Sequence, residues 1–299
     1  MKNIGGQAVI EGVMMKSPVG WSVAVRGPKG DISLKTVETK KLTGFLKWPV
    51  IRGVVALGQA LSIGIKAIEF SGSVAYQETE DDKPLSPLSM ALTLGAAVLL
   101  AVGLFIVLPL YVTKLMGAVV HSVSTSSFMF NFVDGVLRVG VFLIYVFSIG
   151  LWREMRRVYE YHGAEHKVIY TYEAGEELTV ENAKKYKPYH PRCGTSFLLI
   201  VMVISIVVFS FIPQGWSFAL KALSRLVLIP AIAGISYEML RFSAKLKDNP
   251  VMELLVLPGL LLQRLTVREP DNGQIEVALS AMNEVLKLGG DVKEACKQC

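Results

Sequence analysis

The chain has 299 residues, of which 52% are apolar and only 19% are charged, and its formal net charge at neutral pH is +6. So large an apolar fraction argues against a purely soluble protein, because a water-compatible surface would not cover it. The positive charge fits a surface beside anionic lipid headgroups, and we predict no sequence-specific binding of nucleic acid.

Residues 1–43 have the pattern of β-structure in a cytoplasmic segment. Apolar and polar residues alternate over 21–25 and again over 32–34, and a Gly- and Pro-containing turn separates the two runs, which predicts a hairpin. Ahead of it, the glycines of GGQAVIEGVMM (5–15) indicate special backbone angles or a close approach of another group. The first 20 residues lack the apolar core of a cleaved signal peptide, so we expect none.

The next segment, 44–70, contains the apolar stretch 48–65, which only Arg52 and Gln59 interrupt. We interpret it as an amphipathic or re-entrant helix on the cytoplasmic face, and a further transmembrane span is the alternative. The acidic residues that follow belong to a solvated linker, 71–87.

Residues 88–240 form the predicted transmembrane region. The first apolar stretch has 26 residues without a charge, and crossing the ~30 Å hydrocarbon core takes about 20 helical residues. In lipid such stretches must be helical, because the backbone has no water to bond to. The expected fold class is therefore membrane α-helical, with about four transmembrane helices, a small β-containing N-terminal cytoplasmic segment and interfacial or re-entrant helices. The four predicted spans are 88–113, 139–152 with an upstream extension over 132–137, 195–212 and 226–240, and Arg138 is counted with the external connection.

The distribution of positive charge predicts the orientation. If both termini and the connection between the second and third spans are cytoplasmic, 27 of the 31 Lys and Arg residues lie inside and 4 outside. Such a bias toward the cytoplasmic side is the usual determinant of topology. We therefore expect a multi-pass protein whose principal partner is the lipid bilayer.

The tail, 241–299, contains two further predicted elements. Residues 251–262 are apolar but too few to span, and a Pro-Gly pair interrupts them, which indicates a re-entrant or interfacial element. Residues 274–288 have the apolar spacing of an amphipathic helix. Cys296 and Cys299 at the chain end are either incidental or half of a metal or redox pair.

The cytoplasmic loop 153–195 contains three of the four histidines, and His162-Gly-Ala-Glu-His166 matches the pattern H-x-x-E-H. Residues four apart share one face of a helix, so both imidazoles can bind one ion. Glu165 beside them would be the general base that takes a proton from water activated by the ion, or a residue that orients the ligands without binding the ion. Alternatively, the two histidines are polar residues of a juxtamembrane helix that pair with carboxylates or headgroups.

A second pair of possible ligands, His190 and Cys193, lies three residues apart in the proline-rich loop before the third span. Thiol and imidazole ligands suit zinc better than magnesium. We predict a Zn²⁺ site in which His190 or Cys193 completes the ligand set of His162 and His166. The alternative makes Cys193 a small buried residue and His190 a membrane-surface residue.

Four weaker candidates complete the set of possible site residues. Glu11 would add a carboxylate if the N-terminal segment folds over the site, and Arg192 lies in the loop between His190 and Cys193. Glu238 lies near the inner end of the last span, where Arg241, three residues on, is its expected ion-pair partner. A carboxylate within a span is a functional candidate by default.

Three motifs carry a resemblance to a known family: GGQAVIEGVMMKSP at the start, YHGAEHK at 161–167 and HPRCGTSF at 190–197. Together they resemble the YqhQ-like family of bacterial membrane proteins, which is catalogued as a domain of unknown function. The resemblance covers essentially the whole chain. It implies a polytopic protein of the bacterial plasma (inner) membrane. Members of the family are described as predicted metal-dependent enzymes, and the resemblance implies no particular substrate.

Three functions follow from these patterns. The first is a membrane-embedded, zinc-dependent hydrolase of peptide, lipid or phosphoester bonds. The second is a non-catalytic factor that assists the assembly of other membrane proteins or docks a ribosome or translocon, as the basic cytoplasmic surface indicates. The third, a small-solute transporter, is disfavoured because few charges lie in the predicted spans and no inverted repeat is evident.

Overall fold

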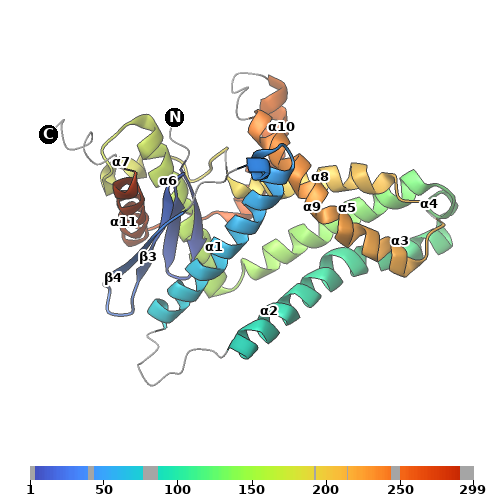
Figure 1. Cartoon of the computed structure of the whole chain (residues 1–299), viewed down its shortest axis with the longest axis horizontal. Coiled ribbons are helices and arrows are strands. Elements are labelled where there is room, and N and C mark those ends of the chain that lie inside the picture. Colours follow the sequence, from blue (N-terminus) through green and yellow to red (C-terminus); the bar gives the residue numbers. More distant parts are fainter. Residues whose placement is uncertain are drawn as a thin grey trace.

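The computed structural model describes residues 4–39, 44–76, 87–191, 193–213, 215–243 and 250–289. This part of the chain is mostly helical, with one small antiparallel sheet near the N-terminus. The strands and several helices gather at one end of the molecule, and long helices extend away from them (Figure 1).

Four strands form the sheet in the order β1-β2-β3-β4, and each neighbouring pair is antiparallel. The hairpin predicted around residues 21–34 is the β3–β4 pair. The β1–β2 pair is a second hairpin that the residue pattern does not predict, and its left-handed residue is Glu11 (φ 48°) rather than a glycine. The strands are β1 (Gly5–Val9), β2 (Gly12–Lys16), β3 (Gly20–Arg26) and β4 (Ile32–Glu38).

Helices cover both faces of this sheet. Successive residues of a strand point to opposite faces, so strands buried on both sides have no polar face. This is the case for β3, whose residues from Gly20 to Val25 are all buried. On one face Met15 and Ala24 pack with α6 (Arg153–Ala174) and α11 (Asn272–Leu288). On the other, Val23 and Val25 pack with Ile63 and Ala67 of α1 (Ile51–Ala75).

The helix α1 joins the sheet to the long helices. Its 25 residues are long and apolar enough to cross a membrane, yet its second half lies on the sheet through Ile63 and Ala67. Its first half packs closely on α9 (Phe218–Ser243), because Gly53 faces Gly234 and a Cβ atom at Gly53 would lie 2.9 Å from the Gly234 Cα. The residues predicted as an interfacial element are therefore part of a longer helix with two different packing surfaces.

The described residues contain four helices that are long and apolar enough to cross a membrane: Ile51–Ala75, Ala91–Val119, Ser127–Ile149 and Phe218–Phe242. The second is a continuous run of α2 (Pro87–Val102), a π-helical turn (Gly103–Val107) and α3 (Leu108–Val119); the third is α5 (Ser127–Ile149). The expected third span corresponds to α8 (Gly194–Ser210), which has only 17 residues. The described residues therefore contain the expected number of helices able to cross a membrane, but α1 is one of them and α8 is not.

Two of these helices begin earlier than the predicted spans. The helix α5 starts at Ser127 and α9 at Phe218, so Arg138 and Arg225 lie inside helices rather than in external connections. The prediction of these boundaries was wrong, because each arginine has a carboxylate partner within the helices and the helix continues through it.

Shorter elements complete the described fold: a 3₁₀ turn (Gly44–Lys47), α4 (His121–Thr125), α7 (Val180–Lys184) and α10 (Pro250–Thr266). The predicted element 251–262 is part of α10, which continues through Pro258. The predicted amphipathic helix 274–288 corresponds to α11, whose apolar residues Ile275, Met282 and Val285 are fully buried.

Candidate metal centre

The helix α6 brings His162 and His166 together. It ends at Gly175, which adopts the left-handed conformation (φ 72°) common at helix C-termini. The spacing of four residues puts both imidazoles on one face, with ring centroids 4.4 Å apart. His166 is almost completely buried and His162 is half-buried. The prediction that the H-x-x-E-H motif lies on a helix is confirmed.

Cys193 approaches the two histidines from the loop that precedes α8. It caps the N-terminus of α8, where its Sγ accepts hydrogen bonds from the backbone N–H and the hydroxyl of Thr195. The same Sγ lies 3.1 Å from His162 Nε2. Among the described residues, one ligand atom from each of His162, His166 and Cys193 lies within 4.8 Å of the others.

The hydrogen bonds of the two imidazoles define which nitrogens face this cluster. His162 Nδ1 lies 2.9 Å from the Thr266 carbonyl oxygen, and His166 Nδ1 lies 2.5 Å from that of Pro188. A carbonyl can only accept, so each Nδ1 donates its hydrogen and each Nε2 carries a lone pair. His166 Nε2 is buried without a hydrogen-bond partner in the described part of the chain.

This donor set fits a zinc ion. Zinc takes histidine nitrogen and cysteine sulfur as ligands, and metal-bound histidines commonly donate their other N–H to a carbonyl or a carboxylate. Two imidazole lone pairs and a thiol converge here, and both Nδ1–H groups are held by carbonyls. The unpartnered Nε2 of His166 is a buried polar atom that an ion would satisfy.

His190 lies beside this group without belonging to it. Its ring centroid is 5.7 Å from that of His166, and its Nε2 lies 3.5 Å from a carboxylate oxygen of Glu173. The Gln263 side chain accepts a hydrogen bond from the His190 backbone N–H and donates one to the His190 carbonyl oxygen, each at 2.8 Å. Of the two residues offered as the third ligand, the structure brings Cys193 into the cluster and places His190 next to it.

Glu165 faces the sheet from the same turn of α6. Its carboxylate accepts a hydrogen bond from the backbone N–H of Gly6, and a Cβ atom at Gly6 would lie 2.8 Å from its Cδ. Burial raises the pKa of the Glu165 carboxyl to about 7, although the electrostatic influence of His162 and the Gly6 hydrogen bond both act to lower it. The first glycine motif therefore makes room for Glu165.

The remaining predicted residues lie elsewhere. Glu11 forms an ion pair with Arg157 and accepts a hydrogen bond from the Tyr161 hydroxyl at 3.3 Å, so it ties the β1–β2 turn to α6. Burial raises the pKa of Tyr161, so this hydroxyl remains protonated and able to donate. Arg192, Cys296 and Cys299 lie outside the described residues.

The ion pair expected between Glu238 and Arg241 is corrected by the structure. Glu238 pairs instead with Arg52 of α1, whose Nε lies 2.7 Å from the Glu238 Oε1 and whose terminal nitrogen binds the other oxygen. A two-pronged contact of this kind is stronger than a contact between neighbours on one helix. It fastens the start of α1 to the end of α9.

Several residues around the cluster were not singled out from the sequence. Gly163, between the two histidines, packs against the segment after α10, and a Cβ atom there would overlap the Arg268 carbonyl oxygen. The Arg268 backbone N–H donates a hydrogen bond to the Tyr159 carbonyl oxygen of α6 at 2.9 Å. This bond fixes the segment after α10 on α6 and so keeps the Thr266 carbonyl, two residues earlier, beside His162. A glycine inside a helix costs about 1 kcal/mol relative to alanine, which is the signal that points to such a contact.

Two comparisons with known proteins give matches over most of the chain. A family model described as "Protein of unknown function (DUF1385)" matches residues 48–288, which include the whole cluster. "Uncharacterized protein YqhQ" of Bacillus subtilis (strain 168) is 34% identical over 300 residues, which cover 95% of this chain and 92% of that protein. No solved structure matches the chain significantly. The chain therefore belongs to the DUF1385 family, and the resemblance to YqhQ-like proteins that its three motifs carry is confirmed.

Proposed function

We propose that this protein is a multi-pass membrane protein and a metal-dependent hydrolase. Its Zn²⁺ centre would face the cytoplasm and be formed by His162, His166 and Cys193. The observation that carries the metal centre is the buried Nε2 of His166, which faces a second imidazole nitrogen and a thiol and has no hydrogen-bond partner among the described residues. The proposed location is the bacterial plasma membrane, with both termini in the cytoplasm.

The exposed apolar side chains of the long helices support the membrane location. On α2, Leu99 is 74% exposed and Leu100 72% exposed. Large apolar surfaces of this kind are rare on soluble monomers, whereas lipid covers them at no cost. Exposed Trp152 lies in the connection between α5 and α6, and exposed Trp216 lies in the connection between α8 and α9. These two connections are at opposite ends of the long helices (Figure 1). Two belts of aromatic residues are typical of the two membrane interfaces.

Packing of α1 on the sheet supports an interfacial position for this helix. Ile63 and Ala67 are buried against the sheet, so the second half of α1 has no lipid-facing role on that side. The proposed spans are then α2–α3, α5, α8 and α9, which leave the sheet, α6 and α11 together on one side. This arrangement agrees with the bias of positive charge toward the same segments.

The ligand set supports the hydrolase assignment. Catalytic zinc sites use three protein ligands and keep a fourth position for substrate or water, whereas structural sites have four protein ligands. When bound, the ion would supply a Lewis acid that polarises a carbonyl or phosphoryl oxygen. Glu165, adjacent to His166 on α6, is the residue that would hold the transferred proton.

A specific observation favours a second candidate, a non-catalytic membrane factor with a structural metal. The cluster joins three segments, α6, the loop before α8 and the end of α10, through His162, Cys193 and the Thr266 carbonyl. The Glu165 carboxylate is also engaged by the Gly6 N–H. In this case the ion stabilises the cytoplasmic part, which would bind other membrane proteins during their assembly, a ribosome or a translocon.

Elemental analysis of the purified protein tests the metal centre. We expect about one zinc per chain in the wild type and none in His166→Ala, with membrane insertion unchanged. His121→Ala is the matched control, because His121 is an exposed histidine on α4 outside the cluster. Wild-type protein that purifies without metal and takes up none during dialysis against zinc contradicts the proposal.

A further inference from the structure

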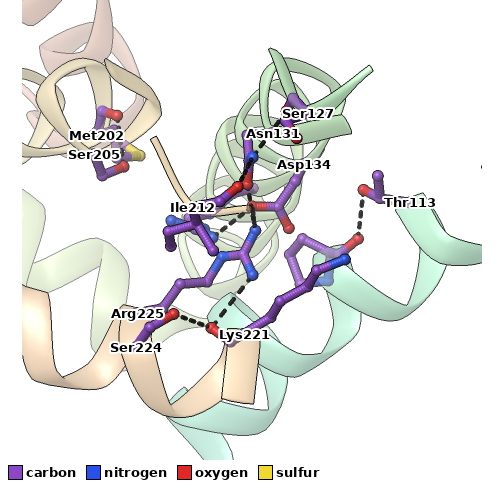
Figure 2. Close-up of polar contacts among 12 residues, drawn as sticks. Thr113, Ser127, Asn131, Asp134, Met202, Ser205, Ile212, Lys221, Ser224 and Arg225 are labelled. Carbon is purple, nitrogen blue, oxygen red and sulfur yellow. Dashed lines mark hydrogen bonds and ion pairs between the residues drawn. The ribbon is translucent and has the colours of Figure 1, made fainter. Parts of the chain in front are cut away.

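A second group of polar residues is buried among the long helices, on elements other than those that hold the histidines. Asp134 and Arg225 are completely buried, and Asn131 and Lys221 are nearly so. These side chains come from α5 and α9, and Figure 2 shows Asn131, Asp134 and Arg225 pointing toward one another. The proposed zinc centre uses none of them.

The arginines of this group share a single carboxylate. Arg225 donates to Asp134 Oδ2 and to Asn131 Oδ1, both at 3.0 Å (Figure 2). Arg138, one turn further along α5, donates to the same Asp134 oxygen at 2.8 Å. Both guanidinium groups also lie against the Phe209 ring, at 4.8 and 5.4 Å from its centroid. The single negative charge of Asp134 is therefore paired with two positive charges, those of Arg138 and Arg225.

Two lysines next to this group add further positive charge. Lys221 Nζ lies 4.3 Å from the centroid of the Phe130 ring, and Lys114 Nζ lies 6.0 Å from that of Phe218. Among the described residues, no carboxylate forms an ion pair with either lysine. Four cations and one carboxylate thus belong to three apolar helices, α3, α5 and α9. Positive charge that is removed from water is costly unless an anion compensates it.

The structure contains space for such an anion. A pocket of about 530 Å³ has both lysines in its wall, together with small or aromatic residues: Gly117, Ala118, Ser124, Phe130 and Gly215. Its volume is within the range of small-ligand sites, roughly 300–1,000 Å³. Two ammonium groups in the lining favour a ligand with multiple negative oxygens.

We propose that this pocket binds a phosphate group, with Lys114 and Lys221 as the residues that contact it. The group belongs either to the headgroup of an anionic phospholipid or to a soluble phosphate. Phe211 and Trp216, which are exposed in the connection between α8 and α9, mark this end of the helices as an interfacial level. Phospholipid phosphates lie at that level, which makes the lipid the expected source.

Thermal unfolding of the detergent-purified full-length protein tests the site. We expect phosphatidylglycerol to raise the unfolding temperature of the wild type in a concentration-dependent way, and phosphatidylcholine to raise it much less. The double variant Lys114→Gln/Lys221→Gln should respond to phosphatidylglycerol only at about tenfold higher concentration per lysine removed, because charge-assisted hydrogen bonds are lost. Lys66→Gln, an exposed lysine of α1, is the matched control and should respond as the wild type does.

The outcomes distinguish a lipid headgroup from a soluble phosphate, and both of these from the absence of phosphate binding at this pocket. Protection by inorganic phosphate alone, absent in the double variant, assigns the site to a soluble anion. Protection by phosphatidylglycerol alone assigns it to the lipid, and Lys114→Arg/Lys221→Arg should retain that protection. Equal responses of wild type and double variant to every probe overturn the proposal. If the double variant does not fold, Lys221→Gln alone is compared with Lys221→Arg by the same criterion. We expect zinc content to be unchanged in each variant, because neither lysine belongs to the metal cluster, so this test is independent of the metal centre.

Discussion

At the scale of single residues, the chemistry of the candidate metal centre depends on which atom of each side chain faces the cluster. The carbonyls of Thr266 and Pro188 hold the Nδ1–H groups of His162 and His166, so both Nε2 lone pairs are directed to the same region as the Cys193 Sγ. Loss of a ligand at any of the three positions should therefore lower the affinity for zinc, although not to the same degree.

The three ligands should differ in a graded way. His162→Ala removes the imidazole nearest to the thiol and should abolish stoichiometric zinc. Cys193→Ser should instead weaken binding, because a neutral hydroxyl replaces a soft thiolate. Zinc affinity is measured by competition with a chelator on purified protein. His190→Ala serves as the comparison, because His190 lies outside the three-residue group and should retain zinc. Equal losses in all of these variants would contradict the assignment of the ligands.

Glu165→Gln distinguishes the two candidate functions. The amide is nearly isosteric and leaves the three ligands in place, so zinc should be retained. If Glu165 is the proton acceptor, the variant should fail to complement a deletion of the gene, because general acid–base catalysis contributes typically 10²–10⁴-fold. If Glu165 only anchors Gly6, complementation should be nearly complete. Retained zinc with full complementation would refute the hydrolase and favour the non-catalytic membrane factor.

At the scale of elements, α6 is shared by the sheet and the metal cluster. One face, with Ala164 and Val168, packs in the core beneath the sheet, and the other presents the two histidines. The segment after α10 crosses this helix at Gly163, where Lys167 also forms an ion pair with Glu269 at 2.6 Å. The crossing holds the Thr266 carbonyl against His162, so helix packing and ligand orientation are coupled.

Gly163→Ala should therefore impair both stability and zinc binding. A methyl group there would overlap the Arg268 carbonyl and force the crossing apart, at a cost of about 1–3 kcal/mol. Thermal unfolding and zinc content of the purified variant measure the two effects. Gly58→Ala in α1 is the matched control, because nothing lies within 4 Å of its added methyl and alanine favours the helix. A Gly163→Ala protein as stable and zinc-loaded as the wild type would show that the crossing is not tight.

At the scale of the whole molecule, the distribution of charge and the folded structure support one orientation. The four Lys and Arg residues that the sequence assigned to the outside all lie within helices: Lys114 in α3, Arg138 in α5, and Lys221 and Arg225 in α9. The connections between α3 and α5 and between α8 and α9 contain no Lys or Arg. The bias of positive charge toward the side of the sheet is thus stronger than the sequence count indicates.

Reporter fusions test this orientation. Fusions at Gly117 and Gly215, at the end of the helices away from the sheet, should report an external location. Fusions at Gly175 and at the C-terminus should report a cytoplasmic one, because the positively charged segments surround them. An external signal at Gly175 would overturn the topology and would place the histidines on the wrong side of the membrane.

Local sequence patterns determined the helical character, the β3–β4 hairpin and the shared helix face of His162 and His166. Their physical cause acts between near neighbours: apolar runs, alternation, turn residues and the spacing of four. Only the tertiary structure decided which distant groups meet. It brought Cys193 rather than His190 to the histidines, paired Glu238 with Arg52 instead of Arg241, and laid α1 on the sheet. The starts of α5 and α9 were unpredictable for the same reason, because the partner that allows Arg225 to remain buried inside α9 comes from another helix.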